Sequence, residues 1–135
     1  FFSMRCDCRF QLTESLKQIA QNGRGVIFYL QQEGRGIGLS NKIKAYSLQD
    51  KGLDTVEANH QLGFKDDERT YENIAGMVKY LAIKELDLMT NNPKKIKALE
   101  DMGIKVNQRV PIFSDTNKYN EKYISTKKSK LGHLI

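Results

Sequence analysis

The stretch that decides the fold runs from Leu86 to Gly103 and reads LDLMTNNPKKIKALEDMG. Its first four residues predict a short strand at 86–89. After Pro93 the apolar residues recur at helical spacing, and a proline at the start with Gly103 at the end is typical of helix boundaries. The next segment, 104–110, alternates partly like a strand. This order of strand, helix and strand indicates a parallel βαβ unit.

The sequence before this unit continues the same alternation. Residues 25–30 (GVIFYL) form a continuous apolar run, which predicts a strand buried on both faces. The other predicted elements are helices at 9–21, 39–50 and 74–82, a short helix near 57–62 within an irregular stretch 51–70, and a lysine-rich tail at 116–130 that is either helical or loose. We therefore expect one α/β domain over residues 1–135, with a mixed or mostly parallel sheet flanked by helices.

The beginning of the chain is unusual. Phe1 and Phe2 stand where an initiating Met is normally found, and the two cysteines follow within a few residues. No structural element fits before those cysteines. We expect a fragment whose N-terminal strands are missing.

Composition narrows the functional classes. The chain has 135 residues, 39% hydrophobic and 28% charged with 2 prolines, which fits one packed domain and excludes collagen-like and wholly disordered classes. No apolar run approaches the roughly 20 residues that span a bilayer, and no signal peptide is visible. Two cysteines are too few for a disulfide scaffold, so we expect a cytoplasmic protein. A net charge of +6 favours anionic partners.

Cys6 and Cys8 form the first candidate site. Two cysteines at this spacing in an extended segment direct both sulfurs to one side, which suits a shared zinc ion. A complete zinc site needs three or four ligands, and His60 and His133 are distant in the sequence. A metal-binding pair and two ordinary buried thiols are both open interpretations.

A glycine-rich loop follows the predicted strand 25–30 and reads QEGRGIG from Gln32 to Gly38. Its glycines allow close backbone approach, and Arg35 can bind a phosphate through two N–H groups. Ligands of α/β proteins bind at this end of parallel strands. We predict a binding loop here, against the alternative of a solvated turn.

The segment TNNPKK, from Thr90 to Lys95, leads from a predicted strand into a helix. Free N–H groups at the helix start, beside a threonine and two lysines, suit a phosphate. The alternative is a solvated first turn. Lysines in that turn oppose the helix dipole unless an anion is present, which favours phosphate binding.

The acidic run from Asp66 to Arg69 is the fourth candidate. Its carboxylates can relay protons, and Arg69 can keep a neighbouring carboxylate ionised. From spacing alone, a solvated run of charges is the stronger interpretation. By the same reasoning Tyr46 is a core residue and His60 a structural histidine.

Together these motifs resemble the GTP cyclohydrolase II family. The resemblance extends over nearly the whole chain, and its segments occur in a specific order. They are RCDC (5–8), QEGRGIGL (32–39), NKIKAY (41–46), DTVEANHQLGF (54–64), DER (67–69) and TNNPKK (90–95).

This resemblance implies a zinc-dependent enzyme that catalyses the first step of riboflavin biosynthesis. The implied reaction hydrolyses GTP at guanine C8, releases formate and pyrophosphate, and leaves 2,5-diamino-6-(5-phospho-ribosylamino)pyrimidin-4-one. Magnesium would accompany the triphosphate. The implied protein is a homodimer with no membrane or nucleic-acid partner.

The resemblance also implies roles for individual residues. Cys6 and Cys8 match two of three zinc thiolates. Arg69 matches the proposed nucleophile toward the α-phosphate, Asp67 the proton acceptor, and Tyr46 a tyrosine close to the active site. The positions that match GTP-binding residues are Gln11, Glu33, Gly34, Arg35, Thr55, Thr90 and Lys95.

The chemistry of these side chains agrees with the implied roles. Arg35, Lys95, a helix N-terminus and magnesium can balance the roughly four negative charges of a triphosphate. We predict that Glu33 accepts hydrogen bonds from the guanine N1–H and exocyclic amine. Because the guanidinium of Arg69 stays protonated, an electrostatic role for Arg69 is open beside the nucleophilic one.

Two departures from the family pattern bear on activity. The third zinc cysteine is expected upstream, in a His-x-Glu-Cys-like segment that precedes the first residue given, and Arg9 stands where a small residue is expected. We therefore expect the 135-residue chain alone to bind zinc weakly and to turn over little GTP. The alternatives are an inactive fragment of the enzyme and a non-catalytic nucleotide- or RNA-binding module, although no aromatic-basic platform for RNA is visible.

Overall fold

The computed structural model describes residues 3–113 and 116–135. Along the chain these residues form α1 (Cys8–Asn22), the 3-10 turn η1 (Glu33–Gly36), α2 (Leu39–Asp50), α3 (Thr55–Gln61), α4 (Glu72–Tyr80), β1 (Glu85–Met89), α5 (Pro93–Asp101), β2 (Lys105–Val110) and α6 (Glu121–Ser129). The predicted α/β class is confirmed. Phe1 and Phe2, which prompted the expectation of a missing start, lie outside the described residues.

The predicted βαβ unit forms and contains the apolar core. β1 and β2 pair in parallel, and α5 connects them. α5 begins with Pro93 and is followed by Gly103 in the left-handed region at φ +82°, as the sequence predicts. A buried cluster joins this unit to α4 and consists of Ile74, Val78, Leu99 and Ile104.

The predicted strand at 25–30 is wrong. The segment is not a strand, and the sheet within the described residues has two strands, β1 and β2. Phe28 and Leu30 pack against the core cluster, but Val26 and Tyr29 are 51% and 49% exposed. The run is therefore only partly covered, and a continuous apolar sequence does not by itself show that both of its faces are buried.

Several helix boundaries differ from the predictions by one or two residues. α4 ends at Tyr80, and Ala82, which the periodicity includes in this helix, has a left-handed backbone with φ +53°. α3 begins at Thr55, because Asp54 and Glu57 form a reciprocal capping box there. The lysine-rich tail is ordered as α6.

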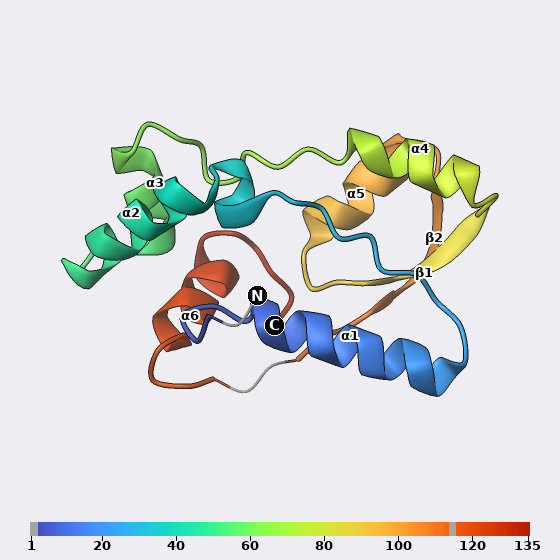
Figure 1. Cartoon of the computed structure of the whole chain (residues 1–135), viewed down its shortest axis with the longest axis horizontal. Coiled ribbons are helices and arrows are strands. Elements are labelled where there is room, and N and C mark those ends of the chain that lie inside the picture. The colour runs from blue at the N-terminus through green and yellow to red at the C-terminus, as the bar shows by residue number, and fades with distance from the viewer. Residues whose placement is uncertain (1–2, 114–115) are drawn as a thin grey trace.

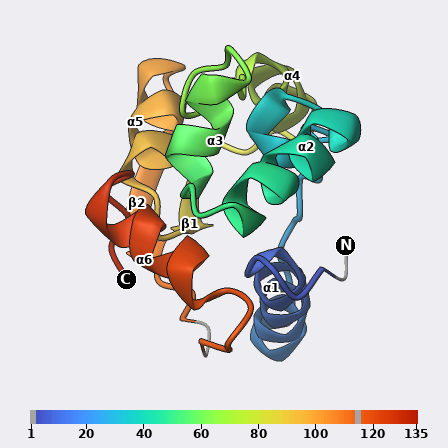
Figure 2. The same cartoon turned by 90° about the vertical axis from the view of Figure 1, so that its left-hand side faces the viewer.

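Two halves are visible in Figure 1. One half holds α4, α5, β1 and β2, and the other holds α2, α3 and α6, with α1 running along one side of the molecule. The end view in Figure 2 places α2 and α3 above α6 and α1. Residues from these four helices face one another across a pocket.

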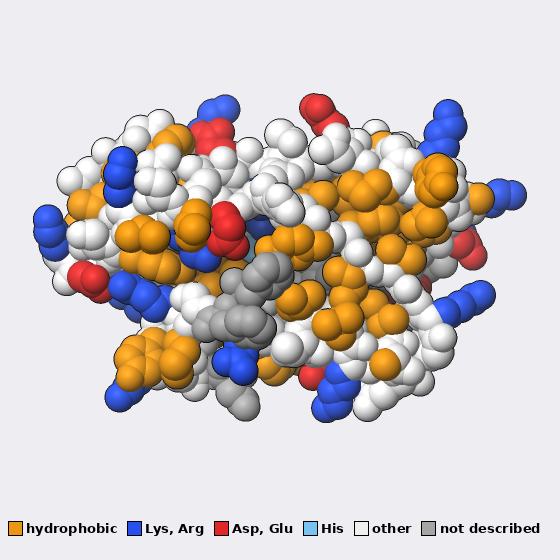
Figure 3. All heavy atoms as spheres, viewed as in Figure 1, with side chains coloured by type: hydrophobic (Ala, Val, Ile, Leu, Met, Phe, Trp, Pro, Cys, Tyr) orange, Lys and Arg blue, Asp and Glu red, His pale blue; other side chains and the backbone are white. Residues whose placement is uncertain are grey.

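Apolar side chains also reach the surface. In Figure 3 they gather most densely over the half that contains the sheet. The large exposed apolar residues include Leu16, Val26, Tyr29, Tyr80 and Leu81. None of the helices in the described parts of the chain combines the length and hydropathy that a membrane crossing requires.

Candidate functional site

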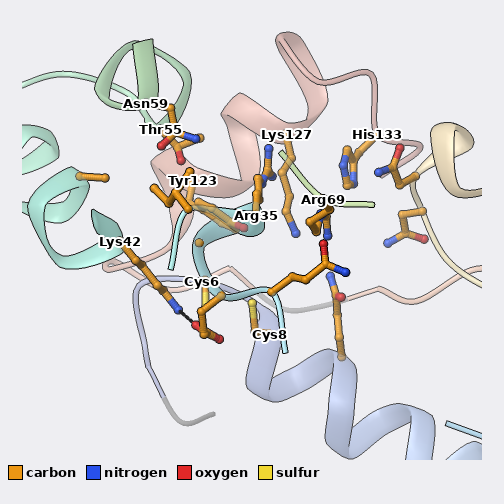
Figure 4. Close-up of a pocket in the computed structure, with 18 of the residues that line it drawn as sticks. Cys6, Cys8, Arg35, Lys42, Thr55, Asn59, Arg69, Tyr123, Lys127 and His133 are labelled. Atoms are coloured by element: carbon orange, nitrogen blue, oxygen red, sulfur yellow. Dashed lines mark hydrogen bonds and ion pairs between the residues drawn. The ribbon is translucent and has the colours of Figure 1, made fainter. Parts of the chain in front are cut away.

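One pocket collects side chains from most of the elements (Figure 4). It is lined by the start of α1, by η1, α2 and α3, by the segment between β1 and α5, and by α6 with the residues that follow it. Of the site residues predicted from the sequence, all but Asp67 line it. They are Cys6, Cys8, Gln11, Glu33, Gly34, Arg35, Tyr46, Thr55, Arg69, Thr90 and Lys95.

The glycine-rich loop forms η1 with an unusual backbone. Gly34 and Arg35 both have φ +60°, and Gly36 has φ +91°. A side chain at Gly36 would place its Cβ 2.8 Å from the backbone carbon of Glu68, so only glycine fits there. The Glu68 amide donates a hydrogen bond of 2.9 Å to the Arg35 carbonyl. These contacts fix Arg35 against the segment that carries Arg69.

Arg69 and Asp67 form a tight pair beside the pocket. The Arg69 Nε donates to Asp67 Oδ1 at 2.9 Å, and the guanidinium also reaches the other carboxylate oxygen. Burial opposes the charge on Asp67, but the hydrogen bonds and charge of Arg69 prevail and hold the pKa of Asp67 below its usual range. The pairing agrees with the expectation that Arg69 keeps a neighbouring carboxylate ionised, and the partly buried pair is not a fully solvated run of charges.

This pairing bears on the two implied catalytic roles. A carboxylate with a lowered pKa is a weak proton acceptor. Although burial opposes the charge of Arg69, its hydrogen bonds to Asp67 raise the pKa of the guanidinium further above neutral. A protonated guanidinium has no lone pair to attack phosphorus. The geometry therefore favours an electrostatic role for Arg69 over a nucleophilic one.

The segment before α5 departs from the prediction in one respect. The Asn92 side chain accepts a hydrogen bond from the Lys94 amide at 3.0 Å, and the Asn92 carbonyl accepts from Lys95 N. The Thr90 hydroxyl in turn accepts from the Asn92 amide at 3.0 Å. The helix start is thus capped from within the chain, and its amides are not the free phosphate donors that the sequence suggested.

The Lys95 side chain, in contrast, does reach the pocket. Burial, together with the charges of Arg69 and Lys127, lowers the pKa of Lys95 to about 8. Among the described residues, neither Lys95 nor Arg35 forms an ion pair with a carboxylate. Two cations without carboxylate partners therefore share one pocket with Arg69 and Lys127.

Cys6 and Cys8 lie side by side at the start of α1. The Cys8 thiol hydrogen bonds to the Cys6 sulfur and lowers the pKa of Cys6 to about 6, although burial acts in the opposite direction. This pair fits two adjacent thiolate ligands of zinc. Within residues 3–113 and 116–135, no group of three or more His, Cys, Asp and Glu side chains is arranged to hold a metal.

Glu33 and Tyr46 stand at the side of the pocket formed by η1 and α2. Lys42 binds one carboxylate oxygen of Glu33 at 2.8 Å. The Arg5 guanidinium stacks over the Tyr46 ring, with 4.5 Å to its centroid. Tyr46 is therefore a lining residue, not the core residue that its helical position suggested. Burial raises the pKa of its phenol, which stays protonated at neutral pH.

Gln11 and Thr55 are the remaining residues that were predicted to bind GTP. Gln11 lies one turn into α1 and donates a hydrogen bond of 2.8 Å to Asp7. Thr55 is the first residue of α3, so the capping box at Asp54 fixes its direction. His60 lies outside the pocket lining and pairs with Asp66, in agreement with the structural role expected for it.

Sequence reasoning assigned no site role to several lining residues, and three of them lie near the end of the chain. Tyr123 and Lys127 come from α6, and His133 follows that helix. A signal for Lys127 exists, because it lies three residues after Ile124 and four before Leu131, both buried, and so shares their helix face. The many lysines around it hide this pattern.

Comparison with known proteins supports one family. The sequence model described as GTP cyclohydrolase II matches residues 1–111. A GTP cyclohydrolase-2 of Campylobacter hominis is 62% identical over 133 residues, which cover 98% of this chain and 67% of that protein. Those of Shewanella amazonensis and Azotobacter vinelandii are both 58% identical over 134 residues, 99% of this chain and 65% and 64% of theirs.

The chain thus spans about two thirds of the length of these curated relatives. The match covers the segments that carry the glycine-rich loop, the Asp67–Arg69 pair and Lys95. The chain belongs to the GTP cyclohydrolase II family.

Proposed function

We propose that this protein hydrolyses GTP at C8 of guanine. It releases formate and pyrophosphate, leaves 2,5-diamino-6-(5-phospho-ribosylamino)pyrimidin-4-one, and so begins riboflavin biosynthesis. One observation carries the proposal: Arg35 and Lys95, two cations without carboxylate partners among the described residues, converge with Arg69 beside two thiols in a single pocket. A nucleoside triphosphate is a ligand that matches such a set of charges.

Different residues of the pocket have different proposed roles. Arg35, Arg69 and Lys95 bind the phosphates, with magnesium accompanying them. Glu33, oriented by Lys42, retains one carboxylate oxygen to accept hydrogen bonds from the guanine edge. Asp67 holds the Arg69 guanidinium in position through its two oxygens.

Cys6 and Cys8 are the proposed zinc ligands, completed by at least one ligand from outside the described residues. Zinc held there supplies Lewis-acid activation of water for hydrolysis at the imidazole ring. The adjacent positions of Cys6 and Cys8 in the pocket lining support the assignment, because zinc binds neighbouring thiolates.

The test compares two proteins. One is the 135-residue chain. The other, the joined protein, is a fusion of this chain with the part of the Campylobacter hominis relative that it does not span, and the segments keep the order that they have in that relative. Formate and pyrophosphate are measured with zinc, magnesium and GTP. We expect multiple turnovers from the joined protein and few or none from the chain alone. A joined protein that folds and holds zinc but releases no formate contradicts the proposal and favours a nucleotide-binding module.

Selectivity provides a second check. Glu33→Gln should reduce the preference for GTP over ITP, because ITP lacks the exocyclic amine that the carboxylate accepts from. Unchanged selectivity would remove Glu33 from guanine recognition without affecting the hydrolysis itself. A homodimer in the cytoplasm is the proposed state of the protein, and the mass of the joined protein in native conditions tests the dimer.

A further inference from the structure

The last part of the chain forms one wall of the pocket. Tyr123, Lys127 and His133 all line it, and Figure 4 shows Lys127 directed between Arg35 and Arg69 with His133 beside them. The family match ends at residue 111, before this wall begins. Nothing in that matched stretch accounts for what these side chains do.

Contacts with two other segments hold the wall in place. The Lys122 ammonium donates to the carbonyls of Gly52 and Leu53 at 2.7 and 3.1 Å, just before α3. Lys130 binds Asp54 at the same end of α3. The Leu134 amide donates to the Asn91 carbonyl at 2.8 Å, beside the start of α5. The position of Lys127 and His133 is therefore built into the fold.

Lys127 is a buried cation, 5% exposed. Its ammonium lies 2.6 Å from Asp7 Oδ1 and 4.9 Å from the centroid of the Tyr123 ring. Asp7 also accepts a hydrogen bond from Gln11, so its charge is shared. An ammonium has three N–H donors, and among the described residues one of them is used in a hydrogen bond. Lys127 thus retains donors for a ligand in the pocket.

His133 is held to the same helix by its amide, which donates to the Lys127 carbonyl at 3.0 Å. Its imidazole faces Lys127 of α6, Arg35 of η1, Arg69, and Asp7 before α1. Burial, with the charges of Lys127 and Arg35, lowers the pKa of His133 to about 4, so the ring is neutral at pH 7. A neutral imidazole offers one N–H donor to an anionic oxygen without adding to the repulsion among the cations.

We propose that Lys127 and His133 bind the phosphate groups of the nucleotide together with Arg35, Arg69 and Lys95. The inference rests on the proposed function, since it names further residues of the same site. It accounts for a buried lysine beside other cations, because a polyanion offsets their mutual repulsion. It also gives the wall a role in ligand binding and not only in folding.

The experiment measures binding by calorimetry with three probes: GTP, inorganic tripolyphosphate and guanosine. Lys127→Gln is compared with Lys128→Gln, a matched control that makes the same charge change at an exposed neighbour on the same helix. We expect Lys127→Gln to weaken GTP and tripolyphosphate by about tenfold or more, because a hydrogen bond to a charged group is lost. Guanosine binding should stay unchanged. Lys128→Gln should stay within about twofold of the original protein for all three probes.

Two further variants separate binding from folding. Lys127→Gln leaves Asp7 buried without its partner, so Asp7→Asn with Lys127→Gln removes both charges and restores a foldable protein. His133→Asn breaks no ion pair, and we expect it to weaken the two phosphate probes by about threefold to tenfold. Lys127→Arg should recover most of the lost affinity.

The outcomes are distinguishable. Weakening of GTP and tripolyphosphate alone, in Lys127→Gln or the double variant and in His133→Asn, supports the inference. If those variants bind tripolyphosphate as tightly as the original chain, the inference is overturned while the proposed function stands. If the joined protein binds neither GTP nor tripolyphosphate, both proposals fail together.

Discussion

The two halves of the molecule are stabilised by different means. In the half with α4, α5 and the sheet, buried apolar side chains such as Leu99 and Val78 pack against one another. Around the pocket, buried polar groups are prominent, among them Asp7, Asn59 and Lys127, at 4%, 4% and 5% exposure. The first half gains stability from burial, whereas the second concentrates like charges that repel one another.

This difference predicts which residues contribute to folding stability and which contribute to ligand binding. A side chain of the core cluster contributes to folding whether or not a ligand is present. A pocket cation without a carboxylate partner among the described residues, such as Lys95, opposes folding in the free protein and acts favourably once an anion arrives. Substitutions in the two halves should therefore have opposite signatures in stability and in anion binding.

The largest expected effect lies in the core. Leu99→Ala removes a buried side chain of the cluster, 7% exposed, and should lower the free energy of unfolding by about 2–5 kcal/mol in urea denaturation. Leu16→Ala deletes the same atoms at a position 54% exposed and should change it by less than about 0.5 kcal/mol. Equal effects at both positions would mean that this cluster is not the core.

The second largest effect is expected at Gly36, a glycine between the two halves. Gly36→Ala should cost about 1–2 kcal/mol for its left-handed backbone and about 1–3 kcal/mol more for the contact with Glu68. Gly23→Ala is the control, since it also has a positive φ, +87°, but nothing within 4 Å of the added atom. Urea denaturation gives both costs, and tripolyphosphate affinity should fall only for Gly36→Ala. Equal losses of stability in the two variants would refute the role of that contact.

The smallest expected effect is a pH dependence at Lys95, whose pKa is lowered to about 8. A bound anion favours the charged lysine, so tripolyphosphate affinity should fall by about tenfold between about pH 7 and about pH 9.5. Lys95→Arg stays charged over this range and serves as the control. If both proteins lose affinity equally, Lys95 is not responsible.

In the ligand-free protein, the effect of rising pH on stability should be opposite to its effect on tripolyphosphate affinity. Below pH 8 the folded state holds a charged Lys95 at a cost. Above pH 8 the folded lysine is neutral, whereas the unfolded one stays charged up to its ordinary value near 10.5. The stability of the original chain relative to Lys95→Arg should therefore rise with pH in that interval, which urea denaturation at several pH values measures.

Local sequence signals predicted much of this molecule. The βαβ unit follows from periodicity, from Pro93 and from Gly103, because each acts over a few neighbouring residues. The site residues were predicted from the resemblance to a known family. In the structure all of them except Asp67 line the pocket. Their individual roles stay predictions.

What the sequence did not predict depends on contacts between distant segments. The run 25–30 looks like a two-sided strand until its neighbours in space are known. The left-handed Arg35 follows from how the loop meets Glu68, more than thirty residues further on. Lys127 lies among many surface lysines that hide its spacing from Ile124 and Leu131, and its partner Asp7 is 120 residues away in the sequence.

The Asp7–Lys127 pair also bears on how the protein is made. Its two members are separated by 120 residues, so Asp7 is synthesised well before Lys127. The βαβ unit, built from local contacts, can form while the ribosome still holds α6. The anion site cannot be completed until α6 emerges and reaches back to the beginning of α1. A nascent chain therefore forms its core before its binding site, and it gains affinity for a polyanion only after α6 has emerged.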